Sequence, residues 1–151
     1  MTDAEVRGAV NDRQCLSLTL FGEVRGEHEE GRRAVASVIA NRLATGRWGK
    51  TWRSVCLWPW QFSCWQPQGG AVNYALVMLM ARSLLDPEPS VLPAALRSCV
   101  ALADLAIAGQ LPDTTGGATH YLTTALYADH PPTWAKQLQQ TVVIGRHVFF
   151  K

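Results

Sequence analysis

The residues best suited to chemistry lie together at positions 23–27, where two carboxylates, Glu23 and Glu27, flank an arginine and Gly26. Large aliphatic side chains recur every four residues over the preceding stretch, residues 16–24, which predicts an amphipathic helix. Glu23 would lie on the last turn of this helix, and Gly26 is expected to end it. Burial at a helix end raises the pKa of a glutamate, so that its carboxyl can donate a proton near neutral pH. Glu23 is therefore the candidate general acid.

Glu27 has two interpretations. Residues four apart share a face of a continuous helix, so Glu27 could act beside Glu23 as a second carboxylate. A helix break at Gly26 would instead separate the two side chains. Glu27 would then cap the next helix or pair with Arg32 or Arg33. We favour this structural role and keep the catalytic one as the alternative.

Beyond these residues, hydrophobic spacing and turn residues predict helices first and a small sheet last. We expect helices at residues 29–42, 72–85 and 93–108, one helical turn at 51–56, a short strand at 120–122 and a β-hairpin of 141–144 with 147–150. Ser90 is expected to cap the helix over 93–108, and Leu79 to face inward from the helix over 72–85. The class is therefore a helix-dominated α+β fold with a small C-terminal antiparallel β-sheet.

Composition is that of a globular protein, with 48% hydrophobic and 17% charged residues in 151 positions. Fourteen basic residues against twelve acidic ones give a net charge of +2, which is too small to make nucleic acid the principal partner. A basic stretch at residues 42–53 is explained equally well by solvated arginines, including Arg42. No nucleic-acid partner is expected.

The four cysteines, Cys15, Cys56, Cys64 and Cys99, form no Cys-x-x-Cys pair, and no histidine stands at zinc-finger spacing from them. We expect free thiols, because Cys within an apolar helical pattern usually behaves as a small core residue. The late histidines are also too scattered for a ligand pattern. No metal and no cofactor are expected.

Several short pieces of the chain, taken in order, resemble the cell wall hydrolase family. Its best-known members are the spore cortex-lytic enzymes, and it also occurs among bacteriophage and prophage lysis proteins. The pieces are residues 23–27, Gly31 with 34–42, Gln61-Phe62-Ser63, 117–121, 132–135 and 144–150. The resemblance extends from residue 18 to 151. It implies a single catalytic domain, residues 1–151, with a lysozyme-like fold.

The activity implied by the resemblance is cleavage of the MurNAc-GlcNAc bond of peptidoglycan glycan strands. Ordinary glycosidases use two carboxylates. In peptidoglycan, the muramic acid 6-hydroxyl can instead attack its own anomeric carbon, so that one acid and base suffices and a 1,6-anhydro end forms. We therefore expect a lytic transglycosylase with Glu23 as its single acid and base. The alternatives are a hydrolytic muramidase or glucosaminidase that also uses Glu27 or Asp113, and a non-enzymatic wall-binding or virion protein.

Five further residues are expected to bind the glycan: Gln61, Ser63, Thr119, His120 and Tyr121. Amide and hydroxyl groups bind sugar hydroxyls and the N-acetyl carbonyl, and in the family the strand over 120–122 lies along the cleft. Leu122 stands where the family usually has another histidine, which weakens any proposal of a histidine pair. Residues 48–65 hold five of the six tryptophans, and one or two of these are expected to stack on sugar rings. Trp134 is expected to anchor the C-terminal sheet.

Residues 1–13 are polar, without the apolar core of a signal peptide, and no run is long enough to span a bilayer. We therefore expect cytoplasmic synthesis of a monomer that is not inserted in a membrane. Such an enzyme reaches peptidoglycan only after the membrane is permeabilised. The expected biology is that of a phage or prophage endolysin that depends on a holin.

Overall fold

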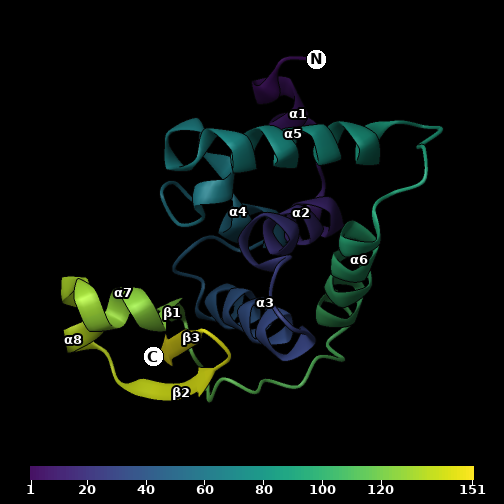
Figure 1. The fold of residues 1–151 in the computed structure, drawn as a ribbon. Coiled ribbons are helices and arrows are strands. Elements are labelled where there is room, and N and C mark those ends of the chain that lie inside the picture. Colours follow the sequence, from purple (N-terminus) through teal and green to yellow (C-terminus); the bar gives the residue numbers. More distant parts are fainter.

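The computed structural model describes residues Met1–Lys151 and contains eight α-helices, two single-turn 3-10 helices and three β-strands (Figure 1). The helices are α1 (Asp3–Ala9), α2 (Asp12–Val24), α3 (Glu29–Thr45), α4 (Trp52–Cys56), α5 (Ala71–Leu85), α6 (Ala94–Ile107), α7 (Thr124–Asp129) and α8 (Thr133–Gln137). The 3-10 helices are η1 (Ser63–Trp65) and η2 (Pro67–Gly69), and the strands are β1 (His120–Thr123), β2 (Gln140–Ile144) and β3 (His147–Phe150). The helix-dominated α+β class is confirmed.

Helix α2 lies at the centre of the helical part and is packed against α3, α4, α5 and α6. Nearly every residue from Cys15 to Val24 is buried, so the helix is enclosed on most sides and is less amphipathic than its sequence spacing suggests. Asn11 and Gln14 form a capping box at its start. The helix ends at Val24, which confirms that Glu23 lies on the last turn.

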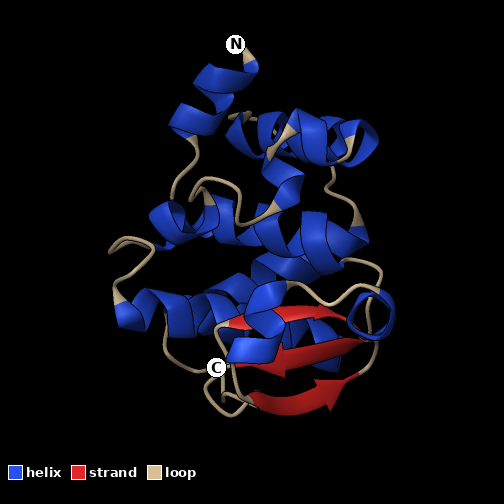
Figure 2. Cartoon of the chain, turned by 90° about the vertical axis from the view of Figure 1, so that its left-hand side faces the viewer, coloured by secondary structure: helices blue, strands red, loops and turns tan.

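The C-terminal sheet is antiparallel with the strand order β1-β3-β2, and Figure 2 shows it at the end of the molecule opposite α1. β3 is the central strand, and all of its residues are buried. The register pairs His120 with Phe150 and Thr123 with His147. The short strand and the hairpin expected from sequence are both confirmed, and Gly145 supplies the positive φ of 57° in the hairpin turn.

Helix α3 joins the helical part to the sheet. One side of the helix contributes Val35 and Ile39 to the main core. The other side packs Ala34 and Val38 against Phe149 of β3. Because one rigid helix contacts both parts, it fixes the position of the sheet relative to α2.

Several expectations about the elements are wrong. No helix was expected before residue 16, yet α1 forms and its Val6 is fully buried. Ser90 does not cap α6, which begins at Ala94 after Pro93 and has no side-chain cap. Leu79 is 55% exposed on α5 and does not face inward. α7 and α8 were also not expected.

Other residues that were expected in the core are buried there. All four cysteines are buried and free in the main core, as predicted. Phe62 is also buried there. Trp134 packs edge-on against Phe150 at a ring distance of 5.5 Å, which confirms that it anchors the sheet. No helix has the length and apolar character needed to cross a membrane.

The close approach of α2 to η1 gives a stability prediction. A Cβ added at Gly22 would lie 2.5 Å from Cys64 Cβ and 2.9 Å from Val77 Cγ2. We therefore expect Gly22→Ala to lower the free energy of unfolding by about 1–3 kcal/mol, the usual cost of overpacking a core. Gly8→Ala is the matched control, because nothing lies within 4 Å of its Cβ position and alanine favours a helix. Urea unfolding of both variants measures the difference, and equal midpoints would contradict this packing.

Candidate active site

The carboxyl of Glu23 emerges from the last turn of α2 at the junction of the helical part and the sheet. Its Oε1 accepts a hydrogen bond from the backbone N–H of Cys64 in η1 at 3.3 Å. Its Oε2 accepts one from the hydroxyl of Tyr121 in β1 at 3.4 Å. Three segments far apart in the sequence therefore converge on this one carboxyl.

Burial raises the pKa of the Glu23 carboxyl above its ordinary value, because desolvation disfavours the ionised form. The hydrogen bonds from Cys64 and Tyr121 and the nearby charge of Arg42 act in the opposite direction, but burial outweighs them. This upward shift of the Glu23 pKa has the direction that the sequence predicts. Glu23 therefore keeps its proton to a higher pH than a solvated glutamate does.

A cleft of about 460 Å³ opens on one side of Glu23. Its walls bring together most of the residues expected to bind glycan: Gln61, Ser63, His120 and Tyr121. Trp60, from the tryptophan-rich stretch expected to supply a stacking ring, also lines it, and three further residues were not expected as site residues: Arg42, Gln66 and Trp134. Thr119 is not part of the lining. Its Oγ1 lies 2.9 Å from Nδ1 of His120, so it contacts the edge of that ring.

His120 lies between two tryptophan rings, with centroids 5.8 Å from Trp48 and 5.0 Å from Trp134. Burial, together with the positive charges of Arg42 and Arg47, lowers its pKa to about 4. The imidazole is therefore neutral near pH 7. It can exchange hydrogen bonds with a sugar, but it is not a cation that would attract an anion.

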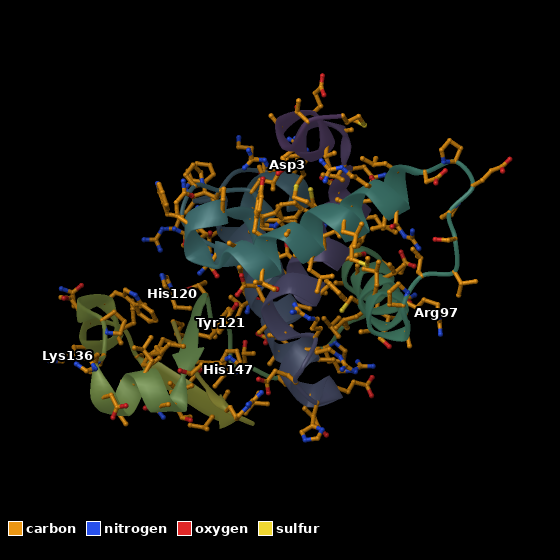
Figure 3. All side chains as sticks on the ribbon, turned by 45° about the horizontal axis from the view of Figure 1, so that its top comes forward. Asp3, Arg97, His120, Tyr121, Lys136 and His147 are labelled. Atoms are coloured by element: carbon orange, nitrogen blue, oxygen red, sulfur yellow. The ribbon has the colours of Figure 1, made fainter.

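Tyr121 follows His120 on β1, and both side chains lie where β1 approaches the helical part (Figure 3). The ring of Tyr121 packs edge-on against His147 at 5.5 Å, and it lies tilted by 32° against Phe149 at 5.9 Å. Burial, followed by the neighbouring charge of Glu23, raises the pKa of the Tyr121 hydroxyl. The hydroxyl therefore keeps its proton and acts as a donor to Glu23.

Arg42 is 5% exposed, so the expectation that it is a solvated arginine is wrong. Its Nε donates to the carbonyl of Thr119 at 2.7 Å, and its Nη1 donates to Oε1 of Gln61 at 3.2 Å. The guanidinium also lies over the rings of Trp48 and Phe62. The sequence does contain a signal for this burial, because Arg42 continues the helical spacing of the buried aliphatic residues of α3.

On the other side of Glu23, two hollows of about 320 and 390 Å³ are both lined by Glu23, Glu27 and Arg146. Arg146, from the hairpin turn, donates to Oε1 of Glu27 at 2.8 Å. The expected pairing of the Glu27 carboxylate with Arg32 or Arg33 is therefore wrong. Arg32 donates to the backbone carbonyl of Glu27, and Arg33 pairs with Glu29. Glu23 lies between these hollows and the cleft.

Comparisons with known proteins agree with this geometry. The family model described as Cell Wall Hydrolase matches residues 26–150. The chain belongs to the cell wall hydrolase family. The matched range begins three residues after Glu23. Comparison with curated proteins gives no match.

Among solved structures, this cell wall hydrolase is similar to the catalytic domain of the germination-specific lytic transglycosylase SleB from Bacillus anthracis. The two share 28% sequence identity and superpose with a TM-score of 0.63. The match covers 95% of this chain and 96% of that chain, so it includes both the helical part and the sheet.

Asp113, the other carboxylate considered for a two-carboxylate mechanism, is held in its own loop. Burial alone would raise its pKa, but hydrogen bonds from Thr115, Asn41 and Gly117 outweigh burial and lower it. Asp113 therefore stays ionised and organises the loop before β1 in this cell wall hydrolase. No group of three or more His, Cys, Asp or Glu side chains is arranged to hold a metal ion.

The contact between Tyr121 and Glu23 gives a pH prediction for this cell wall hydrolase. Tyr121→Phe removes a donor that stabilises the ionised carboxyl, so the pKa of Glu23 should rise further. Titration of the Glu23 carboxyl by ¹³C NMR should show this upward shift. If protonated Glu23 is the active form, the alkaline limb of the activity profile should move upward with it.

Tyr127→Phe is the matched control, because Tyr127 lies in α7 with part of its ring exposed. If Tyr121→Phe changes neither the alkaline limb of the activity profile nor the titration midpoint of Glu23, the hydrogen bond between Tyr121 and Glu23 is contradicted.

Proposed function

We propose that this cell wall hydrolase is a lytic transglycosylase that cuts the MurNAc-GlcNAc bond of peptidoglycan and leaves 1,6-anhydro-muramic ends. One observation carries the proposal: a single partly buried carboxyl with a raised pKa, Glu23, lines a cleft and two further hollows. The likeness to a domain described as a lytic transglycosylase supports it.

In the proposed mechanism, protonated Glu23 donates its proton to the glycosidic oxygen as the bond to the muramic acid C1 breaks. The carboxylate then accepts the proton of the muramic acid 6-hydroxyl as that oxygen bonds to C1. Glu23 ends protonated, and no water is consumed. One group can do both steps because burial keeps it protonated while the donors at Cys64 and Tyr121 stabilise its ionised form.

The glycan strand is proposed to lie along the cleft, with Glu23 beside the bond that is cut. Gln61, Ser63, His120 and Tyr121 offer an amide, two hydroxyls and a neutral imidazole along its walls. We propose that Thr119 acts through His120, since its hydroxyl lies against the imidazole and not in the cleft. No metal or other cofactor takes part in the proposed reaction, and the whole chain acts as one catalytic unit.

A hydrolytic mechanism needs a second carboxylate free to activate water or to attack C1. Glu27 is the nearest candidate along the hollows, but its Oε1 is engaged by Arg146. The carboxylate of Asp113 already accepts hydrogen bonds from Thr115 and Gly117 in its own loop. Both observations favour the single-carboxylate mechanism. A wall-binding protein without activity is disfavoured because it would gain nothing from a buried acid in the cleft.

Substitution of the two glutamates tests the assignment. Glu23→Gln should reduce turnover of purified peptidoglycan about a hundredfold or more, because the amide keeps the shape but cannot transfer a proton. Glu27→Gln should lose much less and is the matched control. Both variants should be compared by turbidity clearance and by binding to the same sacculi. Equal losses of turnover at the two positions, with unchanged unfolding midpoints, would contradict the single-carboxylate mechanism.

A role in host-cell lysis, as a monomeric phage or prophage endolysin that reaches peptidoglycan through a holin, is the part of the proposal supported by the family resemblance alone. Expression in a bacterial cytoplasm should then leave growth unchanged until the membrane is permeabilised, when the culture should clear. Cells that express Glu23→Gln should stay intact under the same treatment. Lysis before permeabilisation would contradict dependence on a holin.

A further inference from the structure

Two tryptophans at the edge of the cleft contribute little to the core. Trp60 is 75% exposed and Trp58 is 41% exposed, whereas Trp48 and Trp65 are buried. Trp58 and Trp60 flank Pro59 in a tight turn that is closed by a hydrogen bond from the N–H of Gln61 to the carbonyl of Trp58 at 3.2 Å. The turn holds both indoles at the surface, where most of the apolar area of Trp60 stays in water and adds little to stability.

The backbone of this turn is strained at Trp60. Its φ is 64°, and every other residue with a positive φ in this protein is a glycine. A bulky side chain in this region costs conformational energy that a glycine would avoid. An exposed indole on a strained residue adds no packing in return, and strain of this kind concentrates at ligand-binding positions.

Beside these tryptophans lies a third hollow, of about 570 Å³, which adjoins the cleft. Its lining includes Trp58, Trp60, Gln66 and Gln68. Trp60 and Gln66 line both this hollow and the cleft that contains Glu23. The two spaces therefore adjoin at these two side chains.

The chemistry of this hollow is that of a sugar site. Indole faces pack against the apolar C–H face of a pyranose ring, and the amides of Gln66 and Gln68 can bond its hydroxyl or N-acetyl groups. A glycan strand is the one polymer already proposed to occupy the adjoining cleft. Because the two spaces share Trp60 and Gln66, the same strand is favoured as the occupant of both.

We propose that Trp58, Trp60 and Gln66 form a distal subsite that binds a further N-acetylhexosamine of the strand held in the cleft. This proposal rests on the proposed function of the cleft. Trp60 stands at the boundary between the two spaces, and Trp58 contacts only the sugar in the distal one. The subsite makes the enzyme favour long strands over short fragments.

Binding measured in a Glu23→Gln background tests the subsite without turnover. The probes are purified peptidoglycan glycan oligosaccharides of increasing length, from the disaccharide upward, titrated by calorimetry. Affinity should increase with length until the distal subsite is filled. Trp58→Ala should weaken binding of the long strands about fivefold to tenfold, the worth of one aromatic stacking contact, and leave the shortest unchanged within about twofold.

Two further variants keep this test independent of folding. Trp60→Gly should also weaken the binding of long strands. Its unfolding midpoint should not fall, because glycine accepts the positive φ. Leu79→Ala, which removes an exposed apolar side chain from α5, should bind every length like the parent.

The proposal is overturned if the Trp58→Ala variant binds long strands with the same affinity as its parent does. It is also overturned if the substitution weakens the binding of short and long strands equally. A Glu23→Gln protein that still cleaves glycan would instead overturn the proposed role of Glu23. In that case, the cleavage rates of long and short strands by the Trp58→Ala variant and its parent would report on the subsite.

Discussion

The buried guanidinium of Arg42 is the interaction on which the geometry of the cleft depends. A buried charge is costly unless hydrogen bonds and neighbouring groups compensate for it. Here Arg42 donates to the carbonyl of Thr119 and to the amide of Gln61, and it lies over two aromatic rings. These contacts tie α3 to the start of β1 on one side and to the segment before η1 on the other. The two walls of the cleft are therefore held by one side chain, which acts by positioning them.

The charge of Arg42 also lowers the pKa of two titratable groups of the cleft, Glu23 and His120. It favours the ionised form of Glu23 against the effect of burial, and it adds to burial in keeping His120 neutral. Burial alone would keep Glu23 protonated but would make it a weak acid, because the carboxylate left behind would be poorly stabilised. With Arg42 nearby and donors at Cys64 and Tyr121, the carboxyl can give a proton and take one back. A mechanism with one acid and base requires this balance, and the engagement of Glu27 by Arg146 leaves no second free carboxylate beside it.

The parts of the structure that depend on local pattern could be predicted from sequence. α2 and the hairpin follow from apolar spacing and a turn glycine, and Glu23 was placed on the right turn. Contacts made across long stretches of chain could not be predicted in this way, such as the pairing of Glu27 with Arg146, 119 positions away. α1 was missed because only Val6 and Val10 mark its buried side, although Thr2 and Glu5 form a readable capping box. The positive φ of Trp60 has no local sequence signal at all.

Digestion of purified peptidoglycan in H₂¹⁸O, followed by mass spectrometry of the released glycans, tests most directly whether Glu23 acts without a second carboxylate. In an intramolecular reaction the muramic acid 6-hydroxyl supplies the new oxygen bond to C1, so water does not enter the product. A single-carboxylate transglycosylase should leave muramic ends that are one water lighter than hydrolysed ends and carry no ¹⁸O. Reducing ends that carry ¹⁸O at C1 would contradict it and would require a second group that activates water.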